Sequence, residues 1–331
     1  MAPVLQVQGL RKHYGDVRAV DGLDLEVQEG EVVAFLGPNG AGKTTTIKVL
    51  TTLTKPTEGR ALVAGHDVVR EPFAARACLG YVSQDVALDR ALTGREHLEL
   101  QADLYHLPKD QAKERIAEVL ALVELQDRAD DPVRQYSGGM RKRLDIACGL
   151  VHRPRVLLLD EPTLGLDLQT RRRIWDAIRA LKAQGLTVLL TTHYLEEADQ
   201  LADRVLIIDR GRIVAQGSPE ELKRAVGGDS VQLRLRNGGL TDGLLEDLRA
   251  MPGVASAAKT DSGVAIVAAQ ADEAIPRIVQ LAAKHGADLE ALTYARPTLD
   301  DVFLRATGRS LRDDEADGDV RTQRAVRRVR A

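Results

Sequence analysis

The sequence predicts an α/β protein with two folded parts, a larger domain on a mainly parallel β-sheet and a smaller α+β domain after it. Over residues 1–226, short apolar runs alternate with longer amphipathic stretches. This is typical of parallel strands whose connecting helices cover both faces of the sheet. A Gly-Gly-Asp stretch at 227–229 marks a linker, and a compact pattern follows over 229–307. The length of 331 residues allows about two domains with cores of their own.

Each strand of the parallel sheet is predicted from an apolar run: residues 31–37, 156–160, 187–191 and 205–209. Residues 5–10 and 21–27 alternate apolar and polar side chains instead, as expected of an antiparallel layer at the edge. We expect a helical subdomain over about residues 85–150, with helices over 94–107 and 111–123. The first domain is therefore expected to have a mixed sheet core with a helical insertion.

The smaller domain has predicted elements in the order βαββαβ, over residues 231–236, 241–250, 254–260, 264–268, 273–284 and 289–294. This order predicts a ferredoxin-like α+β fold. A final helix over 299–307 is expected to dock back onto the protein. Residues 308–331 combine an acidic run with five arginines, and we expect a flexible, solvated tail. A membrane-surface contact by the arginines is the alternative.

The composition excludes several classes of protein. Apolar residues make up 44% and charged residues 29%, which rules out wholesale disorder, a collagen-like chain and a membrane-spanning protein. No apolar run approaches the ~18 residues that cross a bilayer, and the first residues lack the apolar stretch of a signal peptide. The net charge of −3 gives no general affinity for polyanions, so we expect no nucleic-acid partner. Cys78 and Cys148 lack disulfide spacing, and we expect reduced thiols and no disulfides.

The strongest signal is a glycine-rich stretch after the first apolar run. Residues 37–44 fit G-x-x-x-x-G-K-[ST], the phosphate-binding P-loop, and lie between a predicted strand and a predicted helix. The glycines let backbone N–H groups converge on phosphate oxygens, to which the helix N-terminus adds a partial positive charge. Lys43 is expected to bridge the β- and γ-phosphates, and the hydroxyl of Thr44 to bind Mg²⁺. The expected nucleotide-binding residues here are Gly37, Pro38, Asn39, Gly40, Ala41, Gly42, Lys43, Thr44 and Thr45.

Two carboxylates end the second apolar run. Asp160 follows four apolar residues and, in a chain with a P-loop, is expected to hold Mg²⁺ through water as the Walker B acid. Glu161 is expected to polarise the attacking water. An apolar run that ends in Asp-Glu is a weak signal alone, because strands often end in polar turns. The P-loop upstream is what gives the pair its meaning.

A second glycine-rich turn, Ser137-Gly138-Gly139, opens a predicted helix over 141–151. Ser137 is a good N-cap, and the paired glycines leave backbone N–H groups exposed, so the turn is a second phosphate-binding surface. The alternative is an ordinary helix cap without a ligand. One nucleotide cannot be held head-on by both surfaces within one subunit. A head-to-tail pair of chains uses both, with the P-loop of one facing the SGG turn of the other.

In the order of these motifs the sequence resembles the ATP-binding-cassette (ABC) ATPases over residues 4–220. The resemblance implies roles for four further residues. Gln84 matches the Q-loop glutamine, which touches Mg²⁺ and the attacking water and reports to a transmembrane partner. Asp167 matches the D-loop, which crosses the dimer interface, and His193 matches the switch histidine, which contacts the γ-phosphate. Tyr14 matches the aromatic residue that stacks on adenine.

The signature turn places the resemblance within one branch of the family. The usual form is LSGGQ, and here Tyr136 and Met140 occupy its first and last positions, which bears on the tuning of coupling rather than on nucleotide binding. The form YSGGMRKRLDIA resembles the daunorubicin/doxorubicin-resistance branch of ABC exporters, as do residues 299–304 and the small domain before them. In that branch the ATPase and the membrane-spanning permease are separate polypeptides. The match runs to about residue 307.

The resemblance implies an ATP-hydrolysing, energy-coupling subunit of a membrane exporter for a hydrophobic drug or antibiotic. We expect it at the cytoplasmic face of the cell membrane, bound peripherally to a separate permease subunit. Two copies are expected to close on two Mg-ATP molecules, each held between the P-loop of one chain and the SGG turn of the other. Glu161 and His193 are the expected catalytic residues: Glu161 orients or deprotonates water, and His193 holds the γ-phosphate and Glu161 in register.

Three alternative functions stay open at this point. A soluble ABC ATPase that acts on ribosomes or DNA usually carries two cassettes or long coiled-coil arms, whereas this chain has one P-loop and no heptad run. An importer ATPase with a regulatory C-terminal domain would have a solute-binding protein among its genetic neighbours. A P-loop GTPase switch is disfavoured because an N-K-x-D motif is missing and the SGG turn has no place there.

Overall fold

The chain divides into two compact units, the first ending at Pro219 and the second beginning at Glu220. The computed structural model describes residues 3–236, 242–260 and 263–308. The predicted linker at 227–229 lies inside the second unit, and its last residue, Asp229, begins the first strand there. The predicted tail beyond Gly308 lies outside the described residues, so that part of the predicted domain organisation stays a prediction.

The first unit is built on a six-stranded sheet with the order β10-β9-β3-β8-β7-β6. Neighbouring strands are parallel except β9 and β10, which pair antiparallel. Every residue of β3, β7 and β8 is buried, which is why continuous apolar runs predicted them. The four predicted runs are confirmed as strands, whereas β6 and β10 were not predicted. The strands are β3 (Val32–Leu36), β6 (Leu79–Val82), β7 (Val156–Asp160), β8 (Thr187–Thr192), β9 (Arg204–Asp209) and β10 (Arg212–Gly217).

The register of this sheet positions the candidate site. Strand β8 lies between β3 and β7, and the three run parallel. Leu36, at the end of β3, pairs with Thr192 of β8, and Thr191 pairs with Asp160 at the end of β7. The segments that follow these strands therefore leave the sheet at one edge, where the predicted motifs meet.

A second, antiparallel sheet covers one face of the first, together with α1 (Lys43–Leu50). Its strand order is β2-β1-β4-β5. A single hydrophobic core joins Leu10 and Leu25 of this sheet to Phe35 and Leu158 of the parallel sheet. The predicted antiparallel layer is confirmed, although β4 and β5 were not predicted. The strands are β1 (Leu5–Tyr14), β2 (Val17–Val27), β4 (Glu58–Val63) and β5 (His66–Asp67).

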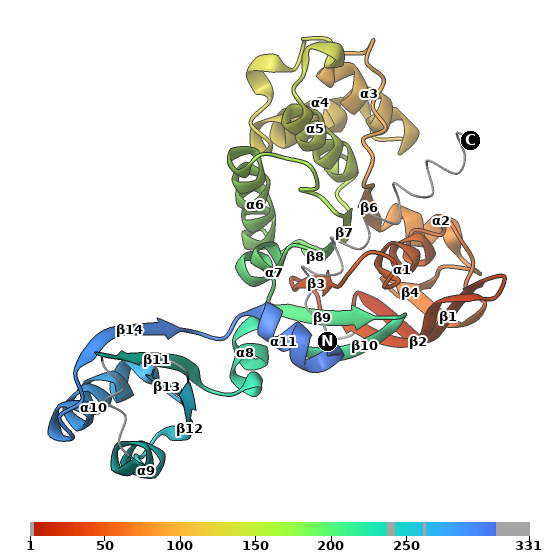
Figure 1. The fold of residues 1–331 in the computed structure, drawn as a ribbon. Helices are drawn as coiled ribbons and strands as arrows, with labels where there is room; N and C mark the ends of the chain where they lie inside the picture. Colours follow the sequence, from red (N-terminus) through yellow and green to blue (C-terminus); the bar gives the residue numbers. More distant parts are fainter. Residues whose placement is uncertain (1–2, 237–241, 261–262, 309–331) are drawn as a thin grey trace, which may run out of the picture. The chain divides into compact units, whose positions relative to one another are not determined.

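Helices α6 (Leu168–Ala183) and α7 (Leu195–Leu201) cover the opposite face of the parallel sheet (Figure 1). Three further helices form a cluster beside the edge strand β6, which confirms the predicted helical insertion (Figure 1). A capping box between Thr93 and Glu96 begins the first of them. The cluster consists of α3 (Gly94–Leu104), α4 (Lys109–Leu122), α5 (Gly138–Leu150) and the short turns η1 (Gln126–Arg128) and η2 (Val133–Gln135), and α2 (Pro72–Ala77) precedes β6.

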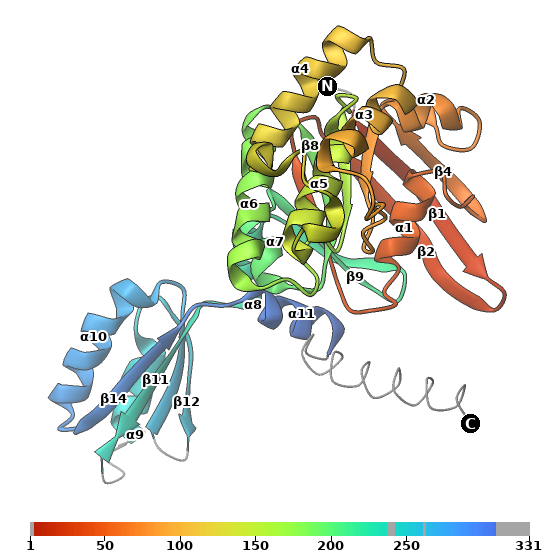
Figure 2. The same ribbon diagram turned by 90° about the horizontal axis from the view of Figure 1, so that it is seen from above.

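The second unit has the predicted βαββαβ order, in an antiparallel sheet with the order β12-β13-β11-β14. Alternate residues of β11 face a core shared with α9 and α10, so both helices lie on one face of the sheet (Figure 2). Arg305 of the last helix donates to the carbonyls of Ala225 and Val226, at the end of α8. The elements are α8 (Pro219–Val226), β11 (Asp229–Leu235), α9 (Asp242–Ala250), β12 (Val254–Thr260), β13 (Gly263–Ala268), α10 (Ala271–Lys284), β14 (Leu289–Ala295) and α11 (Leu299–Thr307).

Two sequence predictions concern the state of the cysteines and the presence of a membrane-spanning segment. Cys78 is half-buried and Cys148 is buried, both as free thiols. Burial raises the pKa of the Cys148 thiol to about 12, so it is protonated and unreactive at neutral pH. Across residues 3–236, 242–260 and 263–308, no helix is both long enough and apolar enough to span a bilayer.

Candidate functional site

A cleft of about 610 Å³ opens where β3, β7 and β8 end. Most of the residues predicted to bind nucleotide line it, although they come from distant parts of the sequence. The side chains that line it from outside the P-loop belong to the first β-hairpin, the segment after β6, and the segments after β7 and β8. The predicted residues among its lining are Tyr14, Pro38, Asn39, Gly40, Ala41, Gly42, Lys43, Thr44, Thr45, Gln84, Glu161 and His193.

The P-loop wraps the space between the end of β3 and the start of α1. Gly42 precedes the helix with φ +107°, where an L side chain is strained, and an added Cβ would lie 2.5 Å from the Ala19 carbonyl oxygen. The loop therefore needs glycine at this position. Helix α1 begins at Lys43, so its unpaired N–H groups and partial positive charge face the cleft. Such a helix N-terminus suits phosphate oxygens.

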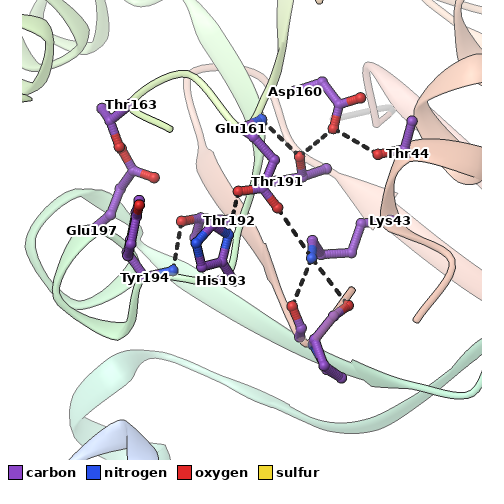
Figure 3. A network of polar contacts seen from close by, with 12 residues as sticks. Lys43, Thr44, Asp160, Glu161, Thr163, Thr191, Thr192, His193, Tyr194 and Glu197 are labelled. Carbon is purple, nitrogen blue, oxygen red and sulfur yellow. Dashed lines mark hydrogen bonds and ion pairs between the residues drawn. The ribbon is translucent and has the colours of Figure 1, made fainter. Parts of the chain in front are cut away.

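Lys43 is buried and held by three oxygens. Its Nζ donates to the Gly37 carbonyl at 2.6 Å and to the Pro38 carbonyl at 3.2 Å. It also pairs with Oε1 of Glu161 at 3.1 Å (Figure 3). The P-loop lysine and the acidic residue that directly follows β7 are 118 positions apart in the sequence, and in the fold they form an ion pair.

Glu161 also contacts His193, with 2.6 Å between Oε2 and Nδ1 (Figure 3). Burial acts to raise the pKa of the Glu161 carboxyl, but the hydrogen bond with His193 and the charge of Lys43 outweigh burial and lower that pKa below its ordinary value. Glu161 is therefore an ionised carboxylate at neutral pH, as a group that accepts a proton from water must be. The two predicted catalytic residues are in direct contact.

Asp160 is buried beneath the cleft and accepts two hydroxyl hydrogen bonds on Oδ1. Thr44 donates to it at 3.1 Å and Thr191 at 2.6 Å. Thr191 also accepts from the Glu161 backbone N–H at 3.0 Å, so it fixes both acidic residues at the end of β7. Thr191 was not among the predicted site residues, because a threonine at the end of a strand carries no signal of its own. Mg²⁺ prefers oxygen ligands such as hydroxyls and carboxylates, so the pair of Thr44 and Asp160 fits a magnesium site.

The SGG turn lies outside this cleft. The described residues that line the cleft do not include Ser137, Gly138, Gly139 or Asp167. Gly138 instead lines a second cavity, of about 290 Å³, together with Gln84 and Glu161. Ser137 caps α5 by accepting from the Met140 N–H at 3.2 Å. Both Ser137 and Gly138 are exposed.

Packing explains two residues of the signature turn. An added Cβ at Gly139 would lie 2.2 Å from Cγ2 of Thr170 on α6, so no larger side chain fits. Tyr136, which departs from the usual leucine, is buried, and its hydroxyl donates to the Arg128 carbonyl at 2.5 Å. The tyrosine thus anchors the turn to the helical cluster.

Asp167 caps the first turn of α6 and is exposed. It accepts from the Thr170 N–H at 2.9 Å and from its hydroxyl at 2.7 Å, and these hydrogen bonds hold the pKa of the Asp167 carboxyl below its ordinary value. Thr170 is also the residue that packs on Gly139. The D-loop aspartate and the SGG turn are therefore joined through one side chain within the same chain.

The segment of Gln84 is held by a buried lysine that was not among the predicted site residues. Lys142, on α5, is 4% exposed and donates to the Ser83 carbonyl at 2.5 Å and the Gln84 carbonyl at 3.5 Å. Asp145, one turn further along α5, lies 4.0 Å from the Lys142 ammonium. This contact ties the signature helix to the backbone of the Q-loop. A lysine within a helix gives no sign of such a contact in the sequence.

Asp145 makes a testable contribution to stability. Burial raises the pKa of its carboxyl to about 6, and the charge of Lys142 only partly opposes this. The folded protein therefore binds this proton more tightly than the unfolded chain, whose aspartate pKa is about 4, and stability falls as pH rises from about 4 to about 6. Asp145→Asn is expected to be neutral near pH 4 and to stabilise by about 1–3 kcal/mol at pH 7, as a pKa shift of about two units implies. Thermal melts of both proteins across this pH range check it, and a constant difference would contradict it.

Two protein families match the chain in succession. The ABC transporter family matches residues 20–164, and the family described as ATP-binding protein DrrA1-3-like, C-terminal domain, matches residues 217–307. The daunorubicin resistance ATP-binding protein DrrA3 of Streptomyces coeruleorubidus is 47% identical over 315 residues, which cover 94% of this chain and 98% of that protein. The chain belongs to the DrrA daunorubicin/doxorubicin resistance family of ABC transporter ATP-binding proteins. It is therefore an ABC transporter ATPase, which binds and hydrolyses ATP.

A further relative and a solved structure are also similar to this chain. The linearmycin resistance ATP-binding protein LnrL of Bacillus subtilis strain 168 is 36% identical, over 94% of this chain and all of that protein. The dimeric structure of a post-hydrolysis state of the ATP-binding cassette MJ0796, bound to ADP and Pi, is similar with a TM-score of 0.59 and 28% identity. The matched region covers 65% of this chain and 98% of the MJ0796 chain.

Proposed function

We propose that this ABC ATPase is the energy-coupling subunit of a membrane exporter whose cargo is a hydrophobic drug or antibiotic. The observation that carries the proposal is the match of residues 217–307 to the DrrA1-3-like C-terminal family. A cassette alone would suit importers, exporters and soluble ATPases alike. The resistance proteins for daunorubicin and for linearmycin share most of their length with this chain, which supports the same cargo class.

ATP is proposed to bind in the cleft of the P-loop, with adenine on Tyr14, which is 48% exposed. The phosphates then lie against the N–H groups of residues 37–42 and the N-terminus of α1. Lys43 is 5% exposed, so little water screens its charge from them. Its ammonium is paired with Glu161, and the γ-phosphate competes with Glu161 for it. ATP binding therefore releases the Glu161 carboxylate toward water.

Thr44, Asp160 and Gln84 are proposed to hold Mg²⁺, which neutralises charge on the β- and γ-phosphate oxygens when bound. Glu161 accepts the proton of the attacking water, since its pKa lies below the ordinary value and its carboxylate is ionised. His193, at 2.6 Å, keeps that carboxylate oriented and contacts the γ-phosphate. The chemistry requires little beyond positioning and charge stabilisation, as phosphoryl transfer generally does.

A second copy of the chain is proposed to supply the SGG turn to each ATP. Ser137 and Gly138 are exposed, and neither is among the described residues that line the cleft of the P-loop. Asp167 is exposed and linked to Gly139 through Thr170, and it is proposed to cross the same interface. The structure of the cassette MJ0796 is dimeric, which supports the pairing of two copies.

Cysteine cross-linking across the proposed interface is expected to depend on ATP. One chain carries Asn39→Cys and the other Ser137→Cys, both at exposed positions and with Cys78 and Cys148 replaced. Mixed with Mg-ATP, the two chains should form a covalent heterodimer on gel electrophoresis, and with ADP they should not. Leu53→Cys is the matched control for Asn39→Cys, because Leu53 is 64% exposed and is not among the described residues that line either cavity. Equal cross-linking with ATP, with ADP and with the control would contradict the head-to-tail dimer.

The partner that couples ATP hydrolysis to transport is proposed to be a separate permease subunit. The chain would then lie at the cytoplasmic face of the membrane, with Gln84 and the helical cluster passing motion to the permease. We class the C-terminal unit as ferredoxin-like, because its antiparallel sheet has the order β12-β13-β11-β14 with both helices on one face.

Drug accumulation tests the exporter. A drug-sensitive host that expresses the chain with its permease should accumulate less daunorubicin than the same host with a Glu161→Gln chain. Equal accumulation in both, with an active ATPase, would contradict this cargo class. Growth that depends on uptake of an external solute would point to the importer instead.

A further inference from the structure

Glu197, on α7, is a fully buried acidic residue that has no part in the proposed binding of ATP and Mg²⁺ or in the proposed attack by water. Its exposed fraction is 0%. Oε1 accepts a hydrogen bond from the Thr163 hydroxyl at 2.9 Å and from the Trp175 indole N–H at 3.0 Å. Oε2 has no hydrogen bond of standard geometry within the described part of the chain, although the Thr192 hydroxyl acts on this carboxyl and lowers its pKa. Burying an acidic side chain is unfavourable, so its presence calls for a compensating role.

The two hydrogen bonds of Glu197 join three segments around the candidate site. Thr163 lies two residues after Glu161, in the loop that leaves β7, and Trp175 lies on α6. Glu197 itself is on the helix that begins two residues after His193. Figure 3 shows Glu197 and Thr163 side by side, next to the pair of Glu161 and His193. One oxygen atom thus ties the loop of Glu161 to the helix that follows His193.

The backbone at Glu161 needs such support. Its φ is +49°, in the left-handed region that residues with a side chain rarely adopt. Strained conformations of this kind persist only where surrounding contacts hold them. Thr191 holds the Glu161 N–H from the strand side, at 3.2 Å to its carbonyl and 3.0 Å to its hydroxyl. On the other side, the contact between Thr163 and Glu197 fixes the chain two residues further on.

We propose that Glu197 is a positioning residue for ATP hydrolysis. It holds the loop of Glu161 against the helix that follows His193, and so keeps the carboxylate of Glu161 and Nδ1 of His193 at 2.6 Å. The inference rests on the proposed function, in which this pair acts on the attacking water. It concerns hydrolysis and leaves ATP binding alone, because Glu197 is not among the described residues that line the cleft of the P-loop.

The hydrogen-bond pattern predicts which replacements preserve the role. Both bonds end on one oxygen, which the side-chain carbonyl of glutamine can supply. Burial raises the pKa of Glu197 despite the bonds it accepts, so an uncharged side chain suits the site. Alanine supplies no acceptor and leaves the Thr163 hydroxyl and the Trp175 N–H buried without partners.

Steady-state ATP turnover of the full chain tests the proposal, well below the melting temperature of each variant. For Glu197→Ala we expect kcat to fall by about 10–100-fold with KM within about twofold of wild type, as for a group that positions the reacting atoms. Glu197→Gln should restore at least about half of kcat, and Thr163→Val should fall between them. The matched control is Asp67→Ala: this carboxylate is 5% exposed and bonded to Arg60 at 2.7 Å, in the antiparallel sheet. Its replacement should lower the melting temperature without changing kcat or KM.

Two results would overturn the proposal: a kcat within about twofold of wild type for both Glu197→Ala and Thr163→Val, or a Glu197→Gln protein as slow as Glu197→Ala. If Glu197→Ala does not fold, Thr163→Val and Glu197→Gln decide the matter, since each changes only a few atoms. Glu161→Gln, measured alongside, separates this inference from the proposed function. An active Glu161→Gln protein would refute the roles given to the pair, whereas an inactive one beside normal Glu197 variants would refute the positioning role only.

Discussion

Replacement of Glu161 by glutamine is expected to lower ATP turnover by about 10²–10⁴-fold, the range that a general base contributes, while ATP binding is retained. Glutamine has the same shape and can still contact Lys43 and His193, which lie at 3.1 and 2.6 Å from the carboxylate. It cannot accept the proton of the attacking water at neutral pH. Because the γ-phosphate is not released, the ATP-bridged dimer should accumulate. Phosphate release and light scattering after gel filtration in Mg-ATP measure the two effects.

Glu196→Gln is the matched control for this substitution. Glu196 is exposed on the helix that follows His193, and the same chemical change there should leave turnover and dimerisation unchanged. A Glu161→Gln protein that hydrolyses ATP at the wild-type rate would show that another group activates the water. The ion pair with Lys43 would then be structural.

Replacement of Lys43 by alanine is expected to abolish nucleotide binding. The side chain is 5% exposed, and its ammonium is the cation that the P-loop places among its own carbonyls. Its loss also leaves the buried Glu161 carboxylate without a cationic partner, and breaking a buried pair in this way costs about 3–5 kcal/mol of stability. We therefore expect a lower melting temperature together with the loss of binding. Titration with a fluorescent ATP analogue and thermal melts measure both.

A double variant separates the two effects of losing Lys43. Combining Lys43→Ala with Glu161→Gln removes the unpaired carboxylate, so part of the lost stability should return while binding stays absent. Lys48→Ala, at an exposed lysine on the same helix, is the control that should bind normally. Wild-type affinity in the Lys43→Ala protein would contradict the role of the P-loop lysine.

The predictable part of the fold is the part that is buried on both faces. Strands β3, β7, β8 and β9 are continuous apolar runs because both of their faces are covered. Strand β10 escaped prediction because it is an antiparallel edge strand whose residues alternate between exposed and half-buried, with Arg212 and Gln216 among the exposed ones. Strand β6 has four residues, including Gly80, where an added Cβ would lie 2.1 Å from the Gly149 carbonyl oxygen. Tertiary packing, which sequence propensity does not contain, makes these segments strands.

The site residues that could be predicted are likewise those that lie in short, contiguous sequence motifs. The P-loop and the Asp-Glu pair each occupy a few adjacent positions with a recognisable spacing. Thr191, Lys142 and Glu197 are single residues whose partners lie about 30 to 60 positions away in the chain. Only the folded sheet brings these partners within hydrogen-bonding distance. The contact of Lys43 with Glu161 has the same origin, and it shows how the two motifs act on each other.

ATP turnover of the purified chain, alone and with its permease in lipid, tests whether this ATPase powers an exporter when wild type is measured beside Glu161→Gln. We expect the permease to raise the wild-type rate and Glu161→Gln to abolish turnover in both settings. Candidate drugs should then stimulate the complex further. Turnover that ignores the permease and responds instead to ribosomes or nucleic acid would contradict the exporter, although the cassette would remain an ATPase.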